Sequence, residues 1–182
     1  FEPRYVTLVR DALATHATMA VVHVSEPGAD LAGRPPIADI AGVGTIVSHA
    51  ELPGGRYHIV LRGRGRVRLQ ELSYAPPYRR ALATLLAPQP GSVPEREVAA
   101  MHASATAFAA LVRERDPTFE LRVSEDASAG ELADAFASHL VLDGRDRQGA
   151  LEELVARKRV RLVTEVLTIQ RATLTPTDGM LN

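Results

Sequence analysis

The sequence contains no cysteine among its 182 residues. This absence excludes disulfide scaffolds, thiolate-bound zinc, iron–sulfur clusters and thiol catalysis. No run of about 18 apolar residues occurs, so the sequence predicts no membrane-spanning segment. Lysine is nearly absent, because Lys158 is the single lysine among 21 basic residues. These absences suit a cytoplasmic protein and restrict any lysine-based catalysis to one position.

The overall composition is that of an ordinary globular protein, with 46% hydrophobic and 24% charged residues. A chain of this length can bury roughly two-thirds of its unfolded surface, which is enough for a sizeable core. With a net charge of −1 and an isoelectric point near 6.7, the protein as a whole does not attract nucleic acid or anionic membranes electrostatically.

The sequence predicts a helix over residues 4–14, with an apolar stripe of Tyr5, Val6, Val9 and Leu13. The rest of the first half has the two-residue period of β-strands. Proline and glycine mark a loop at 25–36, a hairpin turn at Pro53-Gly54-Gly55 and a bend at Gly63-Arg64-Gly65. Short strands with glycine corners favour a small antiparallel barrel. The predicted strands are 19–24, 40–48, 56–62, 66–72 and 78–86.

The second half has the helical period of 3.6 residues. Capping-box spacing occurs at Ser92 with Glu95 and again at Ser128 with Glu131. Residues 116–126 break the pattern and contain a possible short extended segment. The apolar positions of three predicted helices are Val98, Met101, Ala105, Phe108 and Val112; then Leu132, Phe136 and Leu140; and finally Val160, Val163 and Leu167. A further helix is expected at 146–155.

The change of period at a proline-rich linker predicts an α+β protein with two domains. We expect a β domain over 1–90, a helical bundle over 91–175 and a tail over 176–182. Charge follows the same division, because residues 1–90 hold 10 basic and 7 acidic side chains and residues 91–182 hold 11 and 15. The balances are therefore +3 and −4.

No motif in the sequence indicates a catalytic, metal or cofactor site. The six histidines lack the spacing of a helical zinc pair, and no phosphate-binding loop or nucleophile elbow occurs. Lys158 lies in a basic run that is expected to be an exposed helix face. The prediction is therefore a protein without catalytic residues, bound metal or cofactor.

The densest basic cluster lies in the predicted β domain. Arginine and tyrosine are favoured at interfaces because they combine large contact area with polar ends. Exposed strand edges can also accept an added strand through main-chain hydrogen bonds. The alternative interpretation is a solvated sheet face that keeps the protein soluble. The candidate polypeptide-binding residues are Arg56, Tyr57, Arg66, Arg68 and Tyr78.

Several short motifs occur in order along nearly the whole chain. The first is Phe1-Glu2-Pro3-Arg4-Tyr5 and the last is Arg159-Val160-Arg161-Leu162. The motifs between them are Gly44-Thr45-Ile46, Leu52-Pro53-Gly54-Gly55-Arg56-Tyr57, Leu61-Arg62-Gly63, Arg66-Val67-Arg68-Leu69, Tyr78-Arg79-Arg80-Ala81, Glu131-Leu132-Ala133-Asp134, and Gln148 with Leu151-Glu152. In this order and spacing, the motifs resemble the amino-terminal substrate-binding domain of Lon proteases.

The resemblance implies a PUA-like antiparallel β-barrel followed by a helical bundle. In Lon proteases this region binds substrates and aids assembly, and ATPase and Ser-Lys peptidase modules follow it. The chain therefore resembles a standalone bacterial Lon-domain protein, to which the family transfers no catalytic residues. Two departures are His58, where asparagine is common, and the lack of the family's strands before Phe1, which would leave the barrel with an open edge.

Three functions follow as hypotheses. The first is a non-catalytic, cytoplasmic module that binds unfolded or extended polypeptide, or a partner protein, without a membrane or nucleic acid. The second is RNA binding through the basic face of the barrel, which rests on fold analogy alone. The third is an unrecognised hydrolase. A concave apolar patch beside the arginine and tyrosine candidates favours peptide, whereas a continuous convex basic surface favours nucleic acid.

Overall fold

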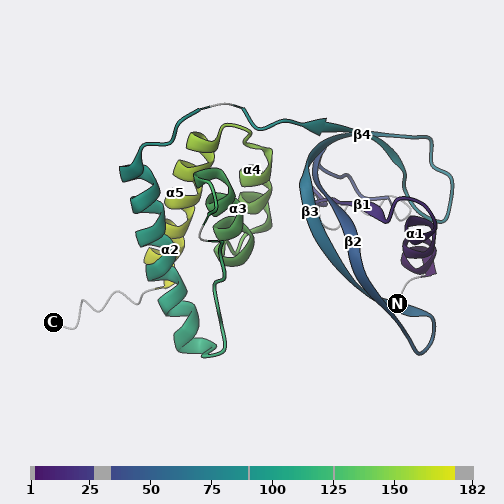
Figure 1. Ribbon diagram of the computed structural model, residues 1–182, viewed down its shortest axis with the longest axis horizontal. Helices are drawn as coiled ribbons and strands as arrows, with labels where there is room; N and C mark the ends of the chain where they lie inside the picture. Colours follow the sequence, from purple (N-terminus) through teal and green to yellow (C-terminus); the bar gives the residue numbers. More distant parts are fainter. Residues whose placement is uncertain (1–2, 27–33, 90, 125, 175–182) are drawn as a thin grey trace. The chain divides into compact units, whose positions relative to one another are not determined.

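The computed structural model describes residues 3–26, 34–89, 91–124 and 126–174. The chain divides into two compact units at the junction of Ala87 and Pro88 (Figure 1). Within the described residues, the first unit, the sheet unit, contains one helix and four strands, and the second, the helical unit, contains four helices. Each unit is described by itself below.

The sheet unit is built on four antiparallel strands in the order β1–β2–β3–β4. The strands are β1 (Thr18–Val21), β2 (Ile40–Leu52), β3 (Arg56–Glu71) and β4 (Ala81–Leu86). The long β2–β3 hairpin curves strongly (Figure 1). Its turn has positive φ at Gly54 (82°) and Gly55 (71°), as predicted, because glycine adopts this conformation without a steric penalty.

The predicted strands 56–62 and 66–72 are one continuous strand, so the predicted break between them is wrong. The chain bends there without leaving the sheet, because β2 and β3 change register between Val43 and Gly44. Gly44 pairs with Gly63 and Val43 with Gly65, which leaves Arg64 as the extra residue of a β-bulge. A second bulge falls at Val47, and the last strand begins at Ala81 rather than at residue 78.

Helix α1 (Pro3–Ala14) packs against one end of the β2–β3 hairpin. Its buried residues are Val9 and Ala12, which meet Ile46 of β2 in a small apolar cluster. Tyr5 is instead 42% exposed, so the predicted stripe is wrong at this position. The cluster is shallow, because the partly buried residues around it outnumber the buried ones: Leu13, Ala17, Met19, Tyr57, Ile59 and Leu61.

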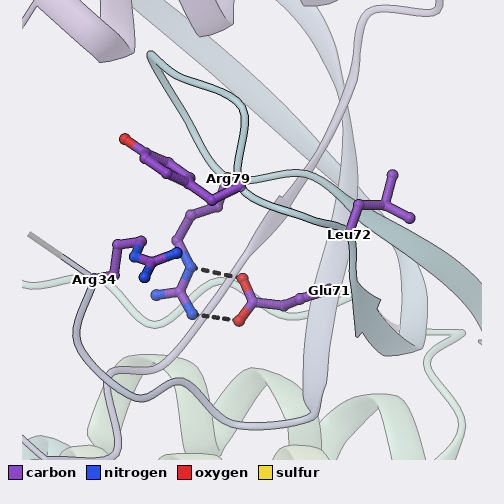
Figure 2. A pocket seen from close by; sticks show the side chains of 5 residues that line it. Arg34, Glu71, Leu72 and Arg79 are labelled. Atoms are coloured by element: carbon purple, nitrogen blue, oxygen red, sulfur yellow. Dashed lines mark hydrogen bonds and ion pairs between the residues drawn. The ribbon is translucent and has the colours of Figure 1, made fainter.

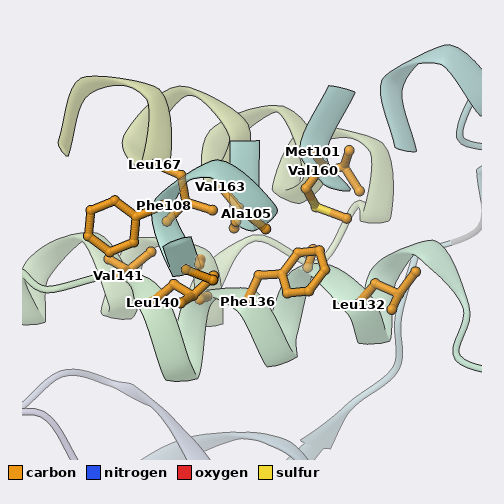
Figure 3. Packing of buried hydrophobic residues seen from close by; sticks show 14 residues of the cluster. Met101, Ala105, Phe108, Leu132, Phe136, Leu140, Val141, Val160, Val163 and Leu167 are labelled. Carbon is orange, nitrogen blue, oxygen red and sulfur yellow. The ribbon is translucent and has the colours of Figure 1, made fainter. Parts of the chain in front are cut away.

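The helical unit has a single deep core (Figure 3). Its helices are α2 (Glu95–Arg115), α3 (Ala129–Leu140), α4 (Gly144–Glu152) and α5 (Ala156–Leu174). The predicted apolar faces of α2, α3 and α5 are confirmed as the positions that line this core. Its largest fully buried side chains are Phe108, Phe136, Met101, Leu140, Leu167, Val160 and Val163.

Local capping decides where these helices begin. Ser128 and Glu131 form the predicted capping box of α3. The predicted box at Ser92 is wrong, because Pro94 directly precedes α2 and makes no side-chain capping hydrogen bond. Asp143 caps α4 by accepting hydrogen bonds from the backbone of Arg145 and Asp146, so this helix begins earlier than residue 146.

Charged side chains tie the helices together around the core. Glu97 of α2 accepts hydrogen bonds from Arg157 and Arg161 of α5 at 2.7–3.1 Å. These two guanidinium groups hold the pKa of Glu97 at about 2, well below its ordinary value. The buried Arg159 pairs with Asp134 of α3 at 2.8 Å.

The described part of residues 116–126 contains no strand, and Phe119 and Leu121 pack against the helical core instead. The predicted tail over 176–182 lies outside the described residues. Among the described residues, no helix is both long enough and apolar enough to cross a bilayer. The predicted α+β class is confirmed by the antiparallel sheet and the separate helices.

Candidate functional site

The predicted site residues Arg56 and Tyr57 lie at the turn end of β3. Arg56 is exposed, and its Nε donates to the carbonyl oxygen of Pro53 at 3.3 Å. Tyr57 packs against the apolar cluster under α1, and its hydroxyl accepts a hydrogen bond from Arg10 Nε at 3.3 Å. Tyr57 therefore helps to hold α1 on the sheet.

Tyr78 lies in the loop before β4 and also contacts α1. Its hydroxyl donates to Asp11 Oδ2 at 2.5 Å. This hydrogen bond to a carboxylate raises the pKa of Tyr78, because it stabilises the protonated phenol. Tyr57 and Tyr78 thus bind adjacent residues of one helix, Arg10 and Asp11.

Arg66 and Arg68 lie in the other half of β3, beyond the Arg64 bulge. Arg66 pairs with Gly42 on one side and Leu86 on the other, and Arg68 pairs with Ile40 and Thr84. Since residues alternate across a strand, these two arginines share one face with Leu82 and Leu86 of β4. Arg68 is exposed on this face.

The five predicted residues do not form one surface. Tyr57 and Arg66 are nine residues apart on one strand, which corresponds to roughly 30 Å along its length. The tyrosines anchor α1, whereas Arg66 and Arg68 lie beside the edge strand β4. These residues are close in sequence, but an extended strand places Arg56 and Tyr57 near one end of β3 and Arg66 and Arg68 near the other.

The outer side of β4 presents backbone hydrogen-bonding groups. Leu72 N donates to Arg80 O at 2.9 Å, which identifies the hydrogen-bonded class of pairs between β3 and β4. Every second pair belongs to this class, so Ala81, Ala83 and Leu85 direct their N–H and C=O groups away from β3. In the described part of the chain, no strand pairs with this side of β4.

The side chains of β4 suit an interface. The strand reads Ala-Leu-Ala-Thr-Leu-Leu and carries no charge. Leu82 is 59% exposed and Leu85 is 68% exposed. Protected edge strands usually carry lysine, proline or inward-pointing charge, and β4 has none of these within its six residues. Sequence reasoning placed a strand here but did not single out its exposed edge, although the absence of charge was visible in the sequence.

A recess of about 220 Å³ lies where β3 ends and the chain turns toward β4 (Figure 2). Arg79 reaches across it to Glu71 in a two-pronged ion pair, with Nε–Oε1 at 2.6 Å and Nη2–Oε2 at 2.5 Å. Arg79 Nη1 also donates to Pro35 O at 2.6 Å. The residues that line the recess are Arg34, Glu71, Leu72, Tyr74 and Arg79.

Electrostatics in this recess leave one positive charge in excess. The ion pair raises the pKa of Arg79 and lowers that of Glu71, so both groups are charged at neutral pH. Arg34 lies over the Tyr74 ring, with its guanidinium carbon 5.0 Å from the ring centroid. Metal-ligating side chains do not gather in groups of three or more anywhere in the described residues.

The chain belongs to the family of the ATP-dependent protease La (LON) substrate-binding domain, whose model matches residues 1–168. It is 27% identical over 171 residues to the Lon protease of Brevibacillus choshinensis, which covers 92% of this chain and 21% of that protein. It is 29% identical over 177 residues to the Lon protease of Roseiflexus castenholzii, with 94% and 21% covered. The chain thus spans about a fifth of the length of these relatives.

Two solved structures share the fold. The N-terminal domain of the Mycobacterium avium complex Lon protease aligns with a TM-score of 0.62 and 15% identity, covering 92% of this chain and 87% of that one. The Lon N-terminal domain protein from Xanthomonas campestris aligns with a TM-score of 0.60 and 20% identity, covering 97% and 86%. The predicted resemblance to Lon amino-terminal domains is confirmed.

Proposed function

We propose that this protein is a non-catalytic module that binds extended or unfolded polypeptide, and that the outer edge of β4 accepts the polypeptide as an added strand. The observation that carries the proposal is the uncharged, exposed edge strand whose backbone groups at Ala81, Ala83 and Leu85 point outward. The family's substrate-binding role supports the kind of ligand.

Main-chain pairing explains how such a module would bind varied sequences. Each outward residue offers one N–H and one C=O, and these groups are the same in every polypeptide. Leu82 and Leu85 add apolar contacts on the two faces of the strand. Arg68 pairs with Thr84 on the same face as Leu82 and adds a polar contact there. The edge therefore combines sequence-tolerant hydrogen bonds with a modest preference for side chains.

The RNA-binding alternative has weaker support. Two of the five predicted residues, Tyr57 and Tyr78, hydrogen-bond to α1, and the Tyr57 side chain also packs against the apolar cluster there, which limits its stacking on bases. The charge balance of +3 over residues 1–90 is small for a protein that must neutralise many phosphates.

The test is a titration of the isotopically labelled protein with a permanently unfolded polypeptide, followed through backbone amide chemical shifts. We expect saturable shifts over residues 81–86. Ala83→Pro removes an outward N–H and places a ring at the edge, so it should weaken binding by about tenfold or more. The edge itself should persist, because proline is tolerated where the N–H faces solvent.

The matched control is Ala20→Pro on the opposite edge. Ile46 N donates to Ala17 O at 2.6 Å, so the alternation of pairs places the N–H of Ala20 on the outer side of β1. This variant should bind as the wild type does. Shifts confined to residues 95–174, no binding at millimolar concentration, or loss of binding in Ala20→Pro alone would each overturn the β4 proposal.

A further inference from the structure

We propose that the recess at the end of β3 is a terminal subsite that binds the α-carboxylate of a polypeptide paired with β4. This inference rests on the proposed function and specifies its substrate class, namely polypeptides that end beside Ala81. The geometry of the sheet, the charge of the recess and the placement of Arg34 each support it.

The direction of the added strand places its carboxyl end at the recess. All neighbouring strands of this sheet are antiparallel, and antiparallel pairing is the commoner arrangement in general. β4 runs from Ala81 to Leu86, so a strand added antiparallel to it runs toward Ala81 and ends there. Arg79 of the recess lies only two residues before Ala81, which is about 7 Å of extended chain.

The charge of the recess selects an anion. Arg79 donates two hydrogen bonds to Glu71 and one to the carbonyl of Pro35, which uses three of its five N–H groups within the protein. Arg34 makes no ion pair within the described residues, and it attracts Glu71 only at longer range. A parallel added strand would bring an amino terminus to this excess positive charge, and repulsion would oppose that arrangement.

The placement of Arg34 suits a carboxylate. The Arg34 guanidinium carbon lies 5.0 Å from the centroid of the Tyr74 ring. A guanidinium group can donate two parallel hydrogen bonds to one carboxylate. The recess of about 220 Å³ is below the usual range for drug-sized ligands, which begins near 300 Å³. Its size therefore fits the end of a chain better than a drug-sized ligand.

The experiment uses two fluorescent peptides of one uncharged, strand-forming sequence, labelled at the amino end. One ends in a free carboxylate and the other in a carboxamide. We expect the intact protein to bind the carboxylate peptide about threefold to tenfold more tightly, because a charge-assisted hydrogen bond at an exposed site is partly screened. The preference should shrink as salt concentration rises.

Arg34→Gln should abolish the preference, so that the ratio of carboxylate to carboxamide affinity falls to about one. Arg80→Gln is the control, because Arg80 is an exposed arginine of the loop before β4 that does not line the recess. Thermal unfolding of both variants confirms that they are folded.

The outcomes separate the two proposals. Equal binding of the two peptides, or a preference that survives Arg34→Gln, overturns the terminal subsite and leaves strand addition standing. If neither peptide binds, strand addition at β4 fails as well. If both peptides bind but Ala83→Pro weakens neither, β4 is not the edge that binds them, and the proposed subsite beside β4 fails as well.

Discussion

The two units of this protein bury their apolar residues very differently. The helical unit gathers 14 buried residues into one core, whereas the cluster under α1 in the sheet unit has three. The sheet unit instead leaves several large apolar side chains exposed, among them Val60, Leu82 and Leu85. The comparison shows that most of the clustered apolar burial, and with it most of the hydrophobic stabilisation, belongs to the helical unit.

The chain allows the two units to be followed separately. It has no tryptophan, and its four tyrosines, Tyr5, Tyr57, Tyr74 and Tyr78, all lie in the sheet unit. Tyrosine fluorescence therefore reports the sheet unit. Far-ultraviolet circular dichroism reports mainly the helical unit, which contains four of the five helices in the described part of the chain.

The largest expected effect comes from the deep core. Phe108 is 1% exposed, so Phe108→Ala should lower the free energy of unfolding by about 3–5 kcal/mol. Ile46→Ala, in the shallow cluster, should cost about 2 kcal/mol, near the low end for such truncations. Denaturant unfolding followed by both signals measures each value.

Exposed apolar positions are the controls for these truncations. Val60→Ala and Leu142→Ala should change stability by less than about 0.5 kcal/mol. The comparison would be contradicted if Phe108→Ala and Ile46→Ala lowered the free energy of unfolding equally and both signals showed one common transition.

A smaller, pH-dependent effect is expected at Glu97. Its folded-state pKa of about 2 lies below the ordinary 4.5, because Arg157 and Arg161 donate to it. The stabilisation is therefore present above pH 4.5 and is lost as pH falls toward 2. Glu97→Gln should lower the melting temperature of the helical unit by a few degrees at pH 7. Between pH 5 and pH 2, the melting temperature of this variant should fall less than that of the wild type.

The control for Glu97 is Glu114→Gln, an exposed glutamate on the same helix. Other acids of the helical unit, Glu131 and Asp143 among them, also have lowered pKa values, so the wild type loses stability in acid for several reasons. Only the difference between the two variants isolates Glu97. A melting profile of Glu97→Gln that parallels the wild type from pH 7 to pH 2 would contradict the prediction.

The smallest effect is expected at the tether between α1 and the loop before β4. Tyr78→Phe removes the hydrogen bond to Asp11 and should cost about 1 kcal/mol or less, because the pair is exposed to solvent. The loss should appear in tyrosine fluorescence and not in the helical signal. Tyr74→Phe is the control, and a helical signal that shifts with Tyr78→Phe would show that the units are coupled.

The sequence by itself determined the features that depend on near neighbours along the chain. Helical spacing identified Met101, Phe108, Val160 and their partners as core positions, because residues three or four apart share one face of a helix. The capping box at Ser128 was readable for the same reason, since it joins residues three apart. Motif order along the chain also identified the family.

Only the tertiary structure decided which distant residues meet. β3 continues through the bulge at Arg64, so Tyr57 and Arg66 lie far apart on one strand. The local sequence around Arg64 predicted a break instead. Strand order made β4 an edge, and hydrogen-bond alternation turned Ala83 outward. The contact of Arg34 with Tyr74 joins two loops that are 40 residues apart, and such contacts are set by the pairing of whole strands rather than by the residues themselves.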